Sequence, residues 1–109
     1  MIKISINRQD GHISSFEISG HANSGPYGYD LVCAAVSAIS FGSVNAVLKL
    51  SKLELQIEQA ENGYLHVDIP HEQINIENFS KAQLIFEAMI ISLQTIEREY
   101  EQFIRISDN

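Results

Sequence analysis

The sequence predicts one α+β domain over residues 1–109, an antiparallel sheet with two helices in the order ββαββαβ. Two pairs of short alternating segments are each joined by a turn dipeptide, Asp10-Gly11 in the first pair and Asn62-Gly63 in the second. A long apolar segment follows each pair. The length of 109 residues suits a single hydrophobic core, so we expect one domain.

The first hairpin is predicted by the residues on either side of Asp10-Gly11, a dipeptide that readily adopts the positive dihedrals of a tight turn. Apolar residues alternate with polar ones before and after this turn, at Ile2, Ile4 and Ile6 and then at Phe16 and Ile18. The segment from Gly20 to Tyr29 is predicted to be a loop, because it contains Gly25, Pro26 and Gly28. Its backbone freedom would let it close on a ligand.

The first helix is predicted from about Leu31 to Ser51, with Asp30 as its N-cap. The segment is apolar on nearly every side, so we expect this helix to be covered all round. Its many small residues would allow close approach by a sheet or by a second copy of the chain. Serine, glycine and asparagine residues within the uncharged run from Leu31 to Leu48 favour a buried helix over a membrane span.

The second half of the chain has the same plan of a hairpin followed by a helix. Apolar residues alternate with polar ones on both sides of Asn62-Gly63, at Leu53, Leu55 and Ile57 and then at Leu65, Val67 and Ile69. Pro70 ends the returning strand. The segment Ser80-Lys81-Ala82-Gln83 has the pattern of a capping box and predicts the start of the second helix. A short closing strand is predicted around Ile104 and Ile106.

The charge balance bears on the kind of partner. Seven basic and fourteen acidic residues give a net charge of −7, which argues against direct binding to nucleic acid. A basic protein would be attracted, although charge taken alone favours the simpler interpretation that it keeps the protein soluble. One cysteine cannot form an internal disulfide, which favours a reducing, cytoplasmic setting. Met1 to Ile6 already has the alternation of a strand, so we expect no signal segment and no membrane association.

The stretch from Gly20 to Ser37 carries the candidate chemistry. With Asp30 as N-cap, Cys33 falls at the third helical position, where the helix dipole favours a thiolate, while the carboxylate of Asp30 opposes it. His21 lies where the preceding strand ends, and Ser37 follows Cys33 by one helical turn. Amides of the first turn would be available to an oxyanion. A nucleophilic cysteine with a histidine base is therefore one hypothesis.

Other interpretations of the same residues remain open. A cysteine among alanines and valines is commonly a small core residue, and a role for Asp30 and Ser37 in the helix alone is the alternative to a catalytic one. His12, His21 and Cys33 are too few and too irregularly spaced for a structural zinc site, so we expect no metal and no cofactor. The chain is then a cysteine enzyme, a binding module without catalysis, or a thiol redox sensor. The redox sensor agrees least with the sequence, because the chain has no resolving cysteine.

Two motifs together resemble the signature of the ribosomal-processing cysteine protease family, Prp. They are Gly20-His21-Ala22 and, after the glycine-bearing loop, Asp30-Leu31-Val32-Cys33-Ala34-Ala35-Val36-Ser37-Ala38. The resemblance extends over essentially the whole chain. It implies that Cys33 is the nucleophile and His21 the general base, with Asp30 and Ser37 as supporting residues. It also implies that the loop bearing Gly20, Ala22, Gly25 and Gly28 orders over the substrate.

The resemblance further implies a substrate and an assembly. The expected substrate is the N-terminal extension of large-subunit ribosomal protein twenty-seven, cut after an aromatic residue, and the expected assembly is a homodimer. The alternative is a ribosome-associated binding or assembly factor that is not an enzyme. Gly25-Pro26, Tyr29 and Gln102 depart from the residues common in the family, and the changes in the loop, at Gly25-Pro26 and Tyr29, leave the subsite preference open.

Overall fold

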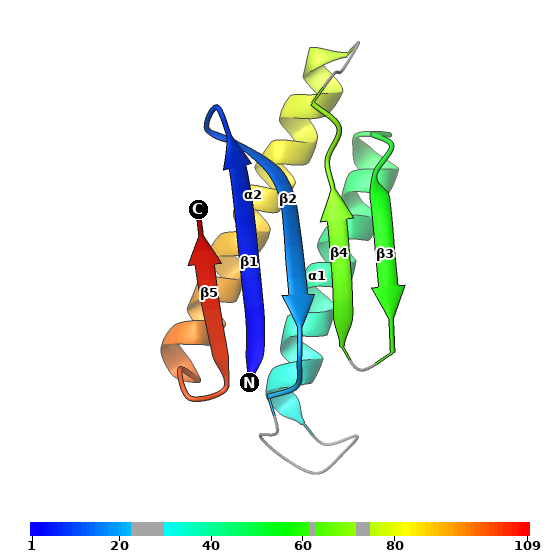
Figure 1. Ribbon diagram of the computed structural model, residues 1–109. Helices are drawn as coiled ribbons and strands as arrows, with labels where there is room; N and C mark the ends of the chain where they lie inside the picture. The colour runs from blue at the N-terminus through cyan, green and yellow to red at the C-terminus, as the bar shows by residue number, and fades with distance from the viewer. Residues whose placement is uncertain (23–29, 62, 72–74) are drawn as a thin grey trace.

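The structure is a computed structural model that describes residues 1–22, 30–61, 63–71 and 75–109 (Figure 1). It confirms the predicted α+β class and the predicted element order ββαββαβ. The elements are β1 (Ile2–Gln9), β2 (His12–Ser19), α1 (Leu31–Leu50), β3 (Gln56–Ala60), β4 (Tyr64–Asp68), α2 (Ile76–Glu99) and β5 (Ile104–Asp108). The third strand therefore begins at Gln56, after Leu53 and Leu55 rather than at them.

The sheet is mixed rather than antiparallel throughout. Its strand order is β3-β4-β2-β1-β5, and β5 pairs in parallel with β1, whereas the other neighbouring pairs are antiparallel. The expectation of a wholly antiparallel sheet is wrong at this edge for a topological reason. The chain leaves β4, returns along α2 and re-enters the sheet in the direction of β4, which is also the direction of β1 (Figure 1).

Both helices cover one face of the sheet, and the core lies between the two layers (Figure 1). The inward side chains of β1 and β2 are the ones that the alternation predicts, and Phe16 of β2 meets Phe86 of α2 with ring centroids 5.0 Å apart. The tight turn at Asp10-Gly11 is also confirmed, because both residues have positive φ, 54° and 81°. The opposite face of the sheet carries polar side chains in its central part.

Helix α1 is not covered all round. Only one stripe is buried, namely Val32, Val36, Ser40, Val44 and Val47. Leu31 and Leu50 are 75% and 62% exposed. A uniformly apolar helix was predicted to be enclosed, but here the sheet and α2 cover one side of it and leave the other open. By length and composition alone α1 is apolar enough to cross a membrane, a test that the core helix of a soluble protein also passes.

Helix α2 begins earlier than the capping-box pattern predicts. Asn75 is the N-cap, and its side chain accepts a hydrogen bond from the amide of Asn78. Ser80 to Gln83 lie within the helix, where the side chain of Gln83 contacts β2. Its side-chain amide bonds both polar backbone groups of Ile13, at 2.9 Å and 2.8 Å. The glutamine therefore joins the helix to β2 instead of closing a helix end.

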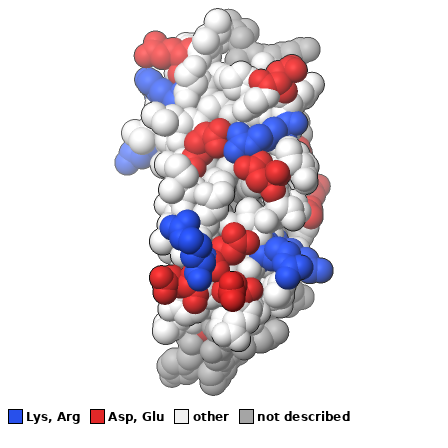
Figure 2. All heavy atoms as spheres, turned by 90° about the vertical axis from the view of Figure 1, so that its left-hand side faces the viewer, with Lys and Arg blue, Asp and Glu red and all other residues white. Residues whose placement is uncertain are grey.

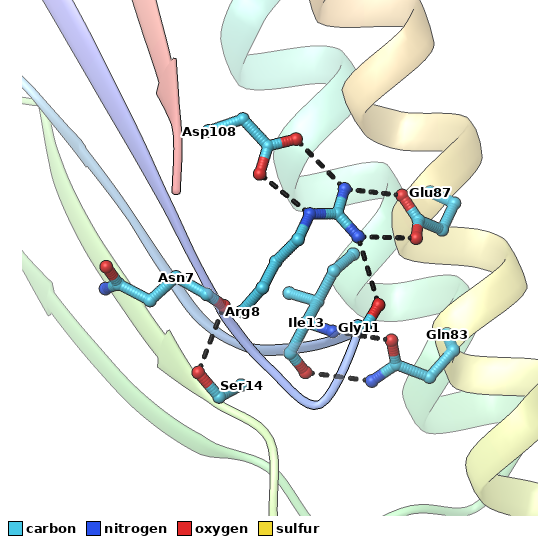
Figure 3. Close-up of polar contacts among 8 residues, drawn as sticks. All are labelled: Asn7, Arg8, Gly11, Ile13, Ser14, Gln83, Glu87 and Asp108. Carbon is cyan, nitrogen blue, oxygen red and sulfur yellow. Dashed lines mark hydrogen bonds and ion pairs between the residues drawn. The ribbon is translucent and has the colours of Figure 1, made fainter.

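An ion-pair cluster that we call the Arg8 clamp joins β1 to α2 and β5 (Figure 3). The guanidinium of Arg8 donates two hydrogen bonds to Glu87, both 2.8 Å, and two to Asp108, at 2.7 Å and 3.0 Å. The hydrogen bonds with Glu87, followed by those with Asp108, raise the pKa of Arg8. The hydrogen bonds from Arg8 lower the pKa of Glu87. Figure 2 shows acidic and basic side chains lying side by side on this side of the molecule.

Candidate functional site

The N-terminus of α1 holds Cys33 where the sequence predicts it. Asp30 is the N-cap, with φ −80° and ψ 99°, and its carboxylate accepts a hydrogen bond from the amide of Cys33 at 3.0 Å. Cys33 is therefore the third residue of the helix, and its side chain is half-buried. A sulfur in this position lies in the positive end of the helix dipole, which stabilises a thiolate.

The backbone that follows β2, next to His21, contacts the sulfur of Cys33. Gly20 follows the last residue of the strand and has φ +88°, His21 is exposed, and Ala22 is 4% exposed. The backbone amide of Ala22 donates a hydrogen bond to Sγ of Cys33 at 3.2 Å. Two segments that are eleven residues apart in the sequence are thereby joined at Sγ of Cys33, and the imidazole is carried by the residue next to this contact.

A recess of about 200 Å³ opens one helical turn further along α1. Ser37, which is exposed, stands at its wall, together with Phe41 of the same helix and Tyr64 and Leu65 of β4. Apolar and aromatic side chains thus line much of a hollow whose wall begins one turn from Cys33. Such a hollow suits an apolar side chain of a bound peptide.

The other histidines lie elsewhere. His12 pairs with Gln9 at the far end of the β1–β2 hairpin, and its ring contacts Phe79 and His71, with centroids 5.2 Å and 6.4 Å away. His66 lies on the polar face of the sheet, 3.2 Å from carboxylate oxygens of Glu17 and Asp68. Partial burial opposes its protonation, but the bonds with Asp68 and Glu17 outweigh it and raise the pKa of His66.

Gly25 and Gly28 of the predicted substrate loop lie outside the described residues. Within the described part of the chain, no three side chains of the His, Cys, Asp and Glu types are grouped so as to hold a metal ion. One residue at the site was assigned by the sequence only to a turn, namely Gly63, which the structure places against Gly20. No local pattern indicates this contact, because the two residues belong to different hairpins.

Comparison with known proteins identifies similar chains along the full length. The family described as cysteine protease Prp matches residues 1–105. The ribosomal processing cysteine protease Prp of Bacillus subtilis is 46% identical over 111 residues, covering 100% of this chain and 98% of the relative. The protein of the same name from Staphylococcus aureus is 40% identical over 109 residues, covering 98% of this chain and 98% of the relative.

Solved structures show the same similarity. The essential ribosomal processing protease Prp of S. aureus, in complex with a covalently linked product peptide, has a TM-score of 0.90 and 38% identity, with 100% of both chains covered. The same protease with a substrate peptide has a TM-score of 0.85 and 38% identity, again over 100% of both chains.

Proposed function

The chain belongs to the cysteine protease Prp family and is a cysteine protease, and from this premise we propose that Cys33 is its nucleophile. One observation carries the proposal. The sequence contains a single cysteine, and the family match covers residues 1–105 around it. The position of Cys33 at the N-terminus of α1, half-buried beside the amide of Ala22, suits a reactive thiolate.

His21 is the general base in this proposal, and the placement of the four histidines supports the choice. His12 and His71 contact each other and Phe79 beside the distant hairpin turn. His66 is engaged by two carboxylates on the polar face of the sheet. His21 alone among them directly adjoins the residue whose amide bonds the sulfur.

The proposed chemistry follows from these positions. His21 takes the thiol proton, and Sγ of Cys33 attacks the scissile carbonyl carbon to form a tetrahedral oxyanion. The amide of Ala22, which already points at Sγ, is the proposed backbone donor to that oxyanion, because the amides of Cys33 and Ala34 in the first turn of α1 are bonded to Asp30. The C–N bond then breaks as the imidazolium protonates the leaving amine. Water, deprotonated by His21, hydrolyses the thioester and releases the acid.

Two further residues support the site without taking part in bond making. Asp30 fixes the start of α1, because its carboxylate accepts from the amide of Cys33 itself. Ser37 stands at the wall of the recess and so contacts substrate rather than the reacting sulfur. We assign the recess to the side chain that precedes the cut bond. The apolar lining agrees with the aromatic residue that the family resemblance implies.

The proposed substrate is the N-terminal extension of a large-subunit ribosomal protein, protein twenty-seven, processed in the cytoplasm. The curated relatives are ribosomal processing proteases, and two of the similar structures hold peptides. A net charge of −7 favours encounter with a basic ribosomal protein. If long-range attraction speeds that encounter, salt lowers kcat/KM more than kcat.

A peptide assay tests the proposal. A peptide spanning the extension and its junction should be cut once, after an aromatic residue, and the cut should be blocked by prior alkylation of Cys33. A peptide in which alanine replaces that aromatic residue is the matched control and should be cut more slowly. Binding of the uncut peptide without any cleavage would instead support a non-catalytic assembly factor.

We also propose that the chain forms a homodimer through its helical layer. A shallow groove between α1 and α2 is lined mainly by small residues, including Ala38, Gly42, Ala46 and Ala88. Leu84 and Ile91 of α2 are 72% and 64% exposed. Apolar surface of this kind, on the outer side of a helical layer, suits a second copy of the same chain.

Sedimentation velocity with a groove variant tests the dimer. A β-carbon added at Gly42 meets nothing within 4 Å, so G42K should fold while a charged side chain obstructs the groove. We expect a dimer for the unmodified chain and a monomer for G42K. The control, Q56K, makes the same change of charge at an exposed position of β3 and should remain dimeric. A dimeric G42K would place the interface elsewhere.

A further inference from the structure

The turn of the β3–β4 hairpin lies against the segment that carries His21. Gly63 precedes β4 and has φ +74°. A β-carbon added to Gly63 would lie 2.6 Å from the carbonyl oxygen of Gly20 and 3.5 Å from Cε1 of His21. The first distance is shorter than real β-carbon contacts, so either the turn or the backbone of Gly20 would have to move.

Gly20 is confined on its other side as well. A β-carbon added to Gly20 would overlap the carbonyl oxygen of Met1 at the start of the chain. Three backbone segments are therefore packed directly on one another: the N-terminus, the end of β2, and the turn before β4. His21 follows this stack immediately, and the residue after it is held by its hydrogen bond to Cys33.

We propose that Gly63 is a positioning residue for His21. The imidazole is exposed, so contacts at its base and along one ring edge must set its direction. The turn before β4 supplies such a contact, because only a residue without a side chain lets it approach the Gly20 carbonyl this closely, and the same turn lies beside Cε1 of His21. A base displaced by about 1 Å loses roughly a hundredfold in rate, so this packing matters for catalysis.

The alternative is that Gly63 serves only its own turn, and the chain contains a matched control for that role. Gly11 also lies in a hairpin turn, with φ +81°, but a β-carbon added there meets nothing within 4 Å. It lies at the opposite end of the β1–β2 hairpin from Gly20 (Figure 1). G11A and G63A therefore share the dihedral strain and differ in the contact with the His21 segment. Gly63 also lines the recess beside Ser37, so an effect of G63A on substrate binding there would appear in KM rather than in kcat.

The experiment compares G63A with G11A in the full chain. We expect a decrease in Tm in both variants, larger in G63A because its β-carbon also meets the Gly20 carbonyl. At a temperature where both variants are folded, the loss of kcat/KM for peptide cleavage should be about tenfold to a hundredfold larger in G63A than in G11A. The loss should appear mainly in kcat, and the pH profile of Cys33 alkylation by iodoacetamide should shift toward that of H21A. Equal kcat/KM values for G63A and G11A would overturn the proposal.

A second measurement does not depend on the variant folding. In the unmodified protein, NMR should show a nuclear Overhauser effect between Hε1 of His21 and the α-protons of Gly63. Its absence would overturn the proposal even if G63A were inactive.

The inference rests on the proposed role of His21, and H21A separates the two claims. Full activity of H21A would remove the assignment of the base. An inactive H21A together with G63A equal to G11A would remove only the positioning role.

Discussion

The two ends of the β1–β2 hairpin are held together in different ways. At the turn end, the Arg8 clamp ties β1 to α2 and β5 with four charged hydrogen bonds between 2.7 and 3.0 Å, and Gln83 bonds both backbone groups of Ile13. At the open end, Gly20 packs by backbone contact against Met1 and Gly63, and Ala22 bonds a sulfur. Strong polar contacts thus lie away from the proposed chemistry.

This difference suggests that the open end of the hairpin serves catalysis and that the turn end serves stability. A charged cluster beside the nucleophile would alter its protonation and compete with substrate for hydrogen bonds. Close packing of glycine backbone adds no charge, so the Asp30 cap is the charged group that the structure places at the N-terminus of α1. We therefore expect substitutions at the open end to reduce activity with little effect on stability. Substitutions at the turn end should do the reverse.

The largest effect is expected at Cys33. C33A should lower kcat/KM for the extension peptide by about 10⁴-fold or more, because the covalent route is lost. Its free energy of unfolding should change by no more than about 1 kcal/mol, since the side chain is small and half-buried. Peptide cleavage followed by mass spectrometry and a urea titration measure the two quantities. Normal cutting by C33A would refute the assignment of the nucleophile.

His21 should come next. H21A is expected to lose nearly as much activity as C33A, because nucleophile and base act as a unit, while its Tm stays the same since the ring is exposed. H66A is the matched control, a histidine replaced on the polar face of the sheet, and it should retain kcat/KM. If H66A lost activity to the same degree, the contrast between the open end and the rest of the sheet would fail.

The Arg8 clamp provides the opposite test. R8Q should reduce the free energy of unfolding by about 1–3 kcal/mol, because two carboxylates lose a shared guanidinium. Its kcat/KM at 25 °C should match that of the unmodified protein. R105Q, at an exposed arginine of β5, is the control and should change neither quantity. If R8Q lost much of its activity at a temperature where it is folded, the Arg8 clamp would also affect the proposed active site, and the two ends of the hairpin would not be independent.

The smallest effect concerns pH. The hydrogen bonds from Arg8 lower the pKa of Glu87 from its ordinary value of 4.5, so the pair stabilises the fold above that value. This contribution should be lost as the pH falls through the pKa of Glu87 in the folded protein. The difference in unfolding free energy between the unmodified protein and R8Q should therefore shrink below pH 4.5. The change will be modest, because the side chain of Glu87 is 41% exposed.

Local sequence patterns predicted much of the structure around Cys33 and of the first hairpin. The cap at Asp30, the helical position of Cys33 and the turn at Asp10-Gly11 each depend on a few adjacent residues, and all three are confirmed. Ser80 to Gln83 shows where local signals mislead. The same residues satisfy a capping box, but a contact of Gln83 with Ile13, seventy residues away, accounts for the glutamine.

Long-range packing explains what the sequence could not predict. The parallel pairing of β5 depends on the path of α2, and the open side of α1 depends on how much surface the sheet and α2 can cover. The contact between Gly63 and Gly20 joins two hairpins, and nothing in the sequence of either hairpin predicts that it contacts the other. Periodicity and turn residues report on neighbours along the chain, whereas these features arise between distant segments.

The positions of the two termini have a practical consequence for handling the protein. Met1 packs on Gly20 beside the proposed base, whereas Asn109 pairs with β1 near the clamp, at the other end of that strand. An affinity tag, fluorophore or surface linkage attached at Asn109 would point away from the cleavage site. The same attachment at Met1 would lie beside Gly20 and the proposed base.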